Sequence, residues 1–173
     1  LVNVSVATVK KEPRFAVAAT TQALAGTPLR LLEFKAPFWR VQMPDGYIGW
    51  VHRLQIARMS EQELSDWNAS QRVVVTARST TLTNENGTVL APLTAGSILR
   101  LIEKQGKQVW VQLPDGNSGF LRTIDVREAN TYFTFYDRVR REDPRTFVRH
   151  LLGNAKKLLG TPYLWGGTST NGV

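Results

Sequence analysis

The chain has 173 residues, of which 42% are hydrophobic and 21% charged, and this composition excludes a disordered or fibrous protein. It is long enough for one large domain or for two to three small ones. No apolar run approaches the roughly 20 residues that span a bilayer, and no cysteine is present to form a disulfide or a thiolate metal site. The N-terminal sequence LVNVSVATVKKEP lacks the regions of a signal peptide, so we expect that any leader has been removed.

The net charge of +8 favours polyanionic surroundings, such as nucleic acid, anionic lipid or an acidic cell-wall polymer. The charge is spread along the chain. Its densest part is DRVRREDPRTFVRH, residues 137–150, where acidic residues interrupt the basic ones. A solvated basic face is therefore the alternative interpretation.

A repeat organises the first two thirds of the chain. The sequence AGTPLRLLE at residues 25–33 matches AGSILRLIE at 95–103, and VQMPDGYIGWV at 41–51 matches VQLPDGNSGFL at 111–121 in the same register. Two matched blocks at one offset predict two copies of one module.

Each copy is predicted to be all-β. Short runs rich in β-branched and aromatic residues end at Pro-Asp-Gly, at 44–46 and again at 114–116, and this sequence is typical of a hairpin turn whose glycine takes a left-handed conformation. In the first copy Trp39, Val41 and Met43 share one strand parity and should point inward, while Arg40 and Gln42 face outward.

In the second copy the inward positions are Val109, Val111 and Leu113, which turns Trp110 outward unless a bulge shifts the register. An exposed tryptophan at this position indicates either a domain interface or a ligand site.

Both copies resemble bacterial SH3-like (SH3b) domains, on the pattern W-x-V-x-x-PDG-x-x-GWV, with Phe120 in the second copy where the first has Trp50. We assign residues 1–57 to the first SH3b domain and 73–127 to the second. The connector, 58–72, should hold a short helix that opens with a capping box of Ser60 and Glu63.

Residues 128–173 change character. An aromatic-rich link, NTYFTFYDRV, leads to an amphipathic helix with Asp143 as N-cap and Pro144 as first residue. Its apolar residues recur at helical spacing; they are Phe147, Val148, Leu151, Leu152, Ala155, Leu158 and Leu159. Gly160 suits a left-handed C-terminal cap, and Pro162 prevents the helix from continuing.

The final sequence, GTPYLWGGTSTNGV, resembles the run that precedes the catalytic cysteine of NlpC-type cell-wall cysteine peptidases. In that family Asp-Cys-Ser-Gly follows directly, so the resemblance implies a nucleophile at the second position after Val173, with the catalytic histidines further on. A cysteine at a helix N-terminus has a lowered pKa, and a histidine beside it completes the thiolate pair.

The 173 residues contain no catalytic set of their own. We expect His52, just past the closing strand of the first barrel, and His150, on the polar side of the helix, to be structural or solvated. No Ser/His/Asp set and no metal-ligand cluster can be assembled, and we expect no cofactor. The chain alone should therefore be inactive.

Tandem SH3b domains with an NlpC-type region resemble γ-D-glutamyl-L-diamino acid endopeptidases of the dipeptidyl-peptidase VI kind, which cut peptidoglycan stem peptides. This resemblance implies that Tyr163 lines the active site near the oxyanion position and that Trp165 lines the same cleft; the alternative is that both are core aromatics. It also implies that Tyr47 and Glu12 hold the free amine of an N-terminal L-Ala. The alternatives are a turn aromatic for Tyr47 and a solvated charge for Glu12.

The expected fold is mainly β: two small SH3-like barrels, then the N-terminal helix and loop of an α+β papain-like domain. The expected partners are stem peptides of the type L-Ala-γ-D-Glu-diamino acid and the remaining catalytic part of the same protein, without nucleic acid or a transmembrane segment. We expect the protein to be located in the cell envelope, either periplasmic or secreted. The alternative is a cytoplasmic protein that recycles peptides.

Two rival functions remain open. The first is a non-catalytic SH3b module that binds the cell wall. The second is nucleic-acid binding, which needs base-stacking aromatics on an open, basic sheet face; the sequence indicates no such pattern.

Overall fold

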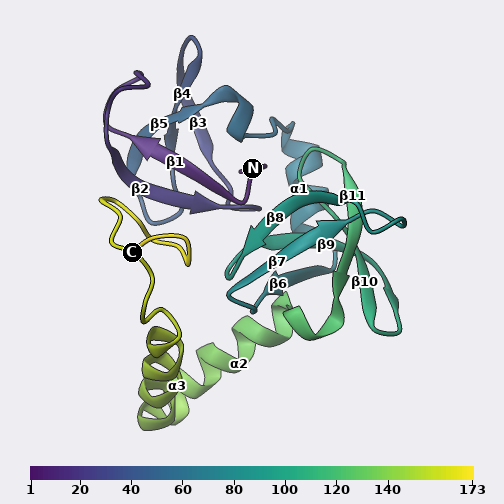
Figure 1. Ribbon diagram of the computed structural model, residues 1–173. Coiled ribbons are helices and arrows are strands. Elements are labelled where there is room, and N and C mark those ends of the chain that lie inside the picture. The colour runs from purple at the N-terminus through teal and green to yellow at the C-terminus, as the bar shows by residue number, and fades with distance from the viewer.

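The computed structural model describes residues 1–173 and is mainly β, as expected, with two antiparallel sheets followed by two helices (Figure 1). The first sheet has the strand order β2-β1-β5-β4-β3. Its strands are β1 (Val6–Lys10), β2 (Ala19–Leu24), β3 (Arg30–Lys35), β4 (Phe38–Gln42) and β5 (Ile48–His52), followed by the 3-10 turn η1 (Arg53–Gln55).

The second sheet repeats this order as β8-β7-β11-β10-β9 and extends it with β6 and β12. Its elements are β6 (Arg72–Val75), β7 (Ser79–Thr83), β8 (Val89–Thr94), β9 (Ile98–Gln105), β10 (Gln108–Gln112), β11 (Ser118–Arg122), the 3-10 turn η2 (Thr123–Asp125) and β12 (Val126–Glu128). The pairing of β12 with β6 has a reduced counterpart in the first copy, an isolated bridge between Val2 and Ile56. The strand order thus reproduces the sequence repeat.

Each copy encloses its own hydrophobic core, and the predicted strand parity is confirmed. Val41 is fully buried in the first core, where Trp39 and Met43 pack partly buried against it. Val109, Val111 and Leu113 are buried in the second core. Alternate residues of one strand point to opposite faces, so the parity alone assigned these side chains to the interior.

The two Pro-Asp-Gly turns are confirmed in detail. Gly46 and Gly116 have φ values of 87° and 91°, which favour glycine. In each turn the aspartate carboxylate accepts the backbone N–H two residues on, from Tyr47 to Asp45 at 3.0 Å and from Asn117 to Asp115 at 3.0 Å. The turns of the two copies are therefore interchangeable in backbone geometry.

The connector contains α1 (Glu61–Ala69), which begins with the predicted capping box: Ser60 accepts the Glu63 N–H, and the Glu63 carboxylate accepts the Ser60 N–H. Trp67 anchors this helix. Its side chain is 2% exposed, and the Arg100 guanidinium lies 5.3 Å from the centre of its ring.

The prediction of an aromatic link after the second copy is wrong, because residues 129–142 form the helix α2 (Ala129–Glu142). Its aromatic side chains recur at helical spacing, with the Tyr132 and Tyr136 rings 4.8 Å apart, and Asp137 pairs with Arg140 and Arg141 one turn on. Helix α2 packs against β6 and β12.

The second predicted helix is confirmed as α3 (Pro144–Lys156), with Pro144 in its first turn and the Asp143 carboxylate accepting the Thr146 N–H at 3.1 Å. Gly160 has the expected left-handed conformation, with a φ of 81°. None of the three α-helices combines the length and the apolar composition that a membrane crossing requires.

The two sheets touch directly. The Ile98 N–H donates to the Ala25 carbonyl at 2.9 Å, and the Asn3 side chain bonds both the carboxylate and the N–H of Asp115. Ala25 belongs to the core of the second copy, although it follows a strand of the first. These contacts fix how the two copies sit against each other.

Candidate functional site

The C-terminal segment 161–173, here called the approach loop, lies beside the first sheet and contacts both copies (Figure 1, yellow). The Thr168 N–H donates to the Gln22 Oε1 atom on β2 at 3.0 Å. On the second copy the Thr170 hydroxyl donates to the Arg78 carbonyl at 2.7 Å and bonds the Thr94 hydroxyl. The loop is thus held between the two sheets.

Arg78 fixes the start of the same loop. Its guanidinium donates to the Lys157 carbonyl at 3.1 Å and to the Thr161 hydroxyl at 2.8 Å. Gln22 and Arg78 therefore position the loop, and sequence reasoning missed both. Their partners are remote in the chain, and neither residue belongs to a recognisable motif.

The glycine pair of the loop is in close contact with backbone. Gly166 has a φ of 72°, and a Cβ there would lie 2.8 Å from the Ala19 carbonyl oxygen on β2. A Cβ at Gly167 would lie 2.5 Å from the Gly172 carbonyl oxygen. Both approaches are to backbone atoms of the chain itself, so neither position has space for a side chain.

Tyr163 and Trp165 project from the loop into solvent. Their side chains are 77% and 67% exposed, so they are not core aromatics of this chain. Neither lines the pocket beside Trp110 or the pocket beside Leu31. The role of these residues as walls of a cleft remains a prediction.

Tyr47 lies at the end of the first sheet where β1 finishes. Gly49 on β5 lies between the Tyr47 ring and Lys10, the last residue of β1. A Cβ at Gly49 would lie 3.6 Å from the ring and 2.9 Å from the Lys10 carbonyl oxygen. Tyr47 is 41% exposed. Its phenol therefore reaches solvent next to the loop that follows β1.

Glu12 belongs to that loop and is exposed, with an ion pair to Arg14. The Lys10 ammonium closes the loop by donating to the carbonyls of Phe15 and Val17, at 2.5 and 2.8 Å. Glu12 follows Lys10, the last residue of β1, by two residues, so its backbone leaves the sheet at the end where Tyr47 lies. Any amine bound there would compete with Arg14 for Glu12.

The approach loop reaches this end of the sheet too. Ala19, against which Gly166 packs, is the strand partner of Lys10. Trp165 precedes Gly166 directly, so it joins the loop where β2 and β1 pair. The backbone near Glu12, Tyr47 and Trp165 therefore passes one corner of the first sheet, where β1 ends; a role of these three side chains in binding remains a prediction.

Both histidines have structural surroundings. His52 is the last residue of β5, not a residue beyond it; its Nδ1 atom accepts the Leu54 N–H at 3.3 Å, and its ring packs on Phe15 and Phe38. His150 on α3 lies edge-on to Phe135 and Tyr136 of α2. Neither faces the approach loop in any contact of the structure.

The surroundings of the buried Asp125 carboxylate in η2 shift its pKa. Burial by itself would raise the pKa of Asp125, but hydrogen bonds from Arg122 and Thr80, together with the Arg122 charge, lower it below its ordinary value. Asp125 also accepts backbone bonds to its carbonyl from Thr76 and Ala77. This network joins η2 to β7 and to the residues that precede β7 in the second copy.

Comparisons with known proteins place this geometry in a class. Residues 9–56 match the family model described as the bacterial dipeptidyl-peptidase SH3 domain. The matched segment covers the end of β1, the strands β2 to β5 and η1, and it contains Tyr47 and Glu12. The first sheet therefore matches the SH3 domain described for bacterial dipeptidyl-peptidases.

Relatives extend the likeness to the whole chain. A γ-D-glutamyl-L-lysine dipeptidyl-peptidase of Bacillus cereus (strain ATCC 10987 / NRS 248) is 28% identical in an alignment of 160 residues that covers 86% of this chain and 45% of that protein. The chain thus spans less than half the length of this curated relative. The sequence-based resemblance to NlpC-type peptidases with SH3b domains is confirmed.

Two solved structures share the fold. An NlpC/P60 family protein from Bacillus cereus ATCC 10987 superposes with a TM-score of 0.76 at 22% identity, covering 99% of this chain and 67% of that one. An NlpC/P60 endopeptidase from Photobacterium damselae subsp. piscicida has a TM-score of 0.53 at 20% identity, covering 74% and 33%. The arrangement of the two sheets and the following helices is therefore that of NlpC/P60 proteins.

Proposed function

We propose that this chain is the recognition part of a cysteine peptidase that hydrolyses peptidoglycan stem peptides between γ-D-Glu and a diamino acid. In this proposal residues 1–57 and 73–127 are SH3b domains joined by the connector 58–72, and 128–173 begin the catalytic domain. The curated relative carries the same activity in its name, with L-lysine as the diamino acid.

The observation that carries the proposal is the position of the approach loop. The loop that would deliver the chain to the catalytic cysteine packs on Ala19, and the strand partner of Ala19 is Lys10, which lies two residues before Glu12 and beside the Gly49 that the Tyr47 ring approaches. A stem peptide bound between them would have its amine at Glu12 and its scissile bond beyond Trp165. A phenol at Tyr163 would donate to the developing oxyanion.

The exposed side of α3 supports a further domain. Leu151 and Leu152 are each 56% exposed, and Val148 is 49% exposed. A row of half-exposed aliphatic side chains on one helix is unfavourable in water at about 25 cal/mol per Å² of apolar surface. We propose that the remaining catalytic part covers this side.

The test uses the intact protein, with L-Ala-γ-D-Glu-L-Lys and its diaminopimelate counterpart as substrates. We expect release of the diamino acid, loss of turnover when the cysteine expected after Val173 is changed to serine, and loss of turnover when the peptide amine is acetylated. Binding to cell walls without any hydrolysis would overturn the proposal and favour the rival, a non-catalytic SH3b module.

Tyr47→Asn tests the amine site. Asn117 occupies the same turn position in the second copy with the same backbone hydrogen bond, so the substitution preserves the turn. We expect KM for the free-amine peptide to rise at least tenfold, with little change in kcat. Glu12→Gln should act in the same direction, and Glu61→Gln, exposed on the connector helix α1, should leave KM unchanged.

A further inference from the structure

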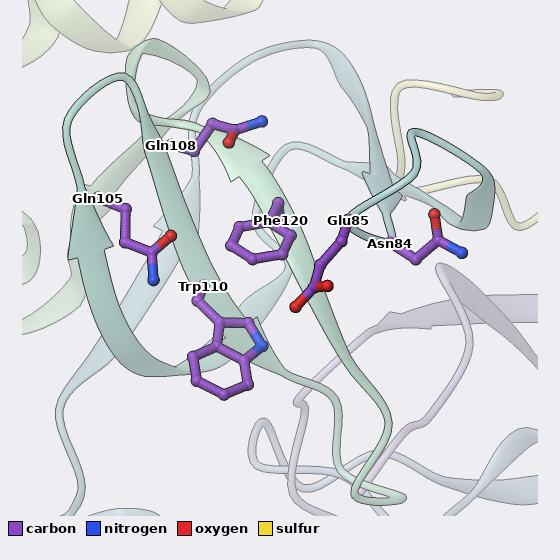
Figure 2. A pocket seen from close by; sticks show the side chains of 6 residues that line it. All are labelled: Asn84, Glu85, Gln105, Gln108, Trp110 and Phe120. Carbon is purple, nitrogen blue, oxygen red and sulfur yellow. The ribbon is translucent and has the colours of Figure 1, made fainter.

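A pocket lies on the outer face of the second sheet, and no residue of the approach loop lines it. It has a volume of about 280 Å³ and is lined by Asn84, Glu85, Gln105, Gln108, Trp110 and Phe120 (Figure 2). All six residues belong to the second copy. The predicted outward direction of Trp110 is therefore correct, and no other part of the chain covers it.

Trp110 and Phe120 form the floor of this pocket. They are directly opposite each other on β10 and β11, with ring centres 6.3 Å apart and planes only 19° from parallel. Figure 2 shows the two rings side by side, with the four polar side chains around them. Both rings are half-buried, which leaves a flat aromatic surface open to solvent.

The fold does not require this surface. The strand pair β4 and β5 of the first copy has the same register, and there Arg40 lies opposite Trp50. Lys35 stands at the repeat position of Gln105. The second copy thus has an aromatic and an amide where the first has two cations, on an unchanged scaffold.

The polar rim has free hydrogen-bonding groups of both kinds. The side chains of Gln108 and Glu85 make no hydrogen bond within the chain, and the Gln105 side chain uses only its amino group, toward Glu103. Asn84 uses its carbonyl oxygen to accept the backbone N–H groups of Asn86 and Thr88 at 3.0 and 2.9 Å, so its amino group remains available. Donors and acceptors therefore surround the aromatic floor.

We propose that this pocket binds a neutral sugar unit of an oligosaccharide. The apolar face of a sugar ring stacks on an aromatic surface, and its hydroxyl groups both donate to and accept from amides and a carboxylate. The pocket lacks any lysine or arginine, and Glu85 repels anions, which disfavours a phosphate or a nucleic-acid strand. Its volume, just under the roughly 300 Å³ of small ligand pockets, suits one or two sugar rings.

This inference does not depend on the proposed peptidase activity, because the pocket shares no residue with the approach loop or with the Tyr47 corner. It assigns the second copy a ligand of its own. The first copy would contact the peptide of the proposed substrate, and the second a carbohydrate.

The experiment titrates the intact protein by calorimetry and by tryptophan fluorescence with three probes: tetra-N-acetylglucosamine, maltotetraose and oligothymidylate. Binding of either sugar supports the proposal, and the preferred one identifies an acetylated or an unacetylated glycan as the source. Binding of oligothymidylate alone, or of no probe, overturns it.

The matched variant is Trp110→Arg, which installs the residue of the first copy. We expect the Kd for the sugar to rise at least tenfold. Thermal unfolding should be unchanged, since Arg40 occupies the same position in the first copy. Phe120→Trp, also taken from the first copy, should retain binding, and Ile124→Ala, exposed on η2 outside the pocket, should have no effect. Equal sugar affinity in Trp110→Arg and the unaltered protein would overturn the assignment.

Discussion

The backbone N–H of Ile98 donates to the carbonyl of Ala25, and this single bond joins the start of β9 in the second copy to the turn after β2 in the first. The next residue, Gly26, leaves no space for a side chain: a Cβ there would lie 2.1 Å from the Ile98 carbonyl oxygen. The two copies are therefore in backbone contact, closer than two domains on a flexible linker.

Gly26→Ala should separate the two copies. The residue has a φ of 82°, so alanine would be strained by ~1–2 kcal/mol, and the clash with Ile98 adds ~1–3 kcal/mol. We expect a clear loss in free energy of unfolding, together with faster proteolysis in the connector 58–72. Gly46→Ala is the control: it has the same φ strain with nothing within 4 Å, and a loss as large as that of Gly26→Ala would contradict the explanation.

Asp125→Asn should destabilise the second copy at neutral pH. The charged Asp125 accepts two bonds from Arg122 and one from Thr80, and bonds to a charged group contribute ~1.5–3 kcal/mol. The pKa of Asp125 is lowered in the folded state. Its contribution is thus complete above the unfolded value of about 3.9 and is lost as the pH falls through the lower folded value.

Urea unfolding at pH 7 and at pH 3 measures this difference. The difference in free energy of unfolding between the unaltered protein and Asp125→Asn should be large at pH 7 and smaller at pH 3. Asp66→Asn, on the exposed side of α1, should leave stability almost unchanged at both values. A difference in free energy of unfolding that is larger at pH 3 than at pH 7 would mean that the folded state does not favour the charged form of Asp125.

Trp67→Ala should detach α1 from the second copy. The side chain is 2% exposed and stacks with Arg100, and truncating a buried aromatic to alanine costs ~3–5 kcal/mol. The Trp67 indole N–H has no partner, so Trp67→Phe loses no hydrogen bond and should cost much less. Thermal unfolding followed by circular dichroism measures the loss of stability in each variant. Equal losses in Trp67→Ala and Trp67→Phe would contradict the explanation by packing.

Arg78→Met should loosen the approach loop without unfolding the chain. The substitution removes the bonds to Lys157 and Thr161 but keeps most of the aliphatic stem. We expect amide exchange in residues 161–173 to be about tenfold faster, which corresponds to ~1.4 kcal/mol. Arg138→Met on α2 is the control, and exchange that is equally fast in both variants would show that Arg78 does not hold the loop.

The repeat, the turns and the inward residues of both sheets were predictable because each depends on local chemistry. A Pro-Asp-Gly turn fixes its own geometry, and alternation along a strand decides which of Val109 and Trp110 is buried. The helix α2 was missed because its aromatic residues suggested a connecting segment, although Tyr132 and Tyr136 are one helical turn apart.

The candidate site was predictable only in part. Tyr47 and Glu12 follow from the resemblance to a family, whereas Gln22 and Arg78 act through contacts with residues far along the chain. Such contacts exist only once both sheets are formed and placed against each other. For the aromatic floor of the second copy, strand parity predicted that Trp110 points outward. That Phe120 lies opposite Trp110 depends on the register of β10 and β11.

The attachment of Thr168 to Gln22 has a consequence for ligand length. Because the approach loop is bonded to one sheet at Gln22 and to the other at Arg78, its separation from the Tyr47 corner is fixed before any ligand arrives. Binding then costs little ordering of the protein. Under the proposed function this fixed separation determines how many residues lie between the amine and the scissile bond of a bound peptide. Peptides with more residues between these two groups would not fit.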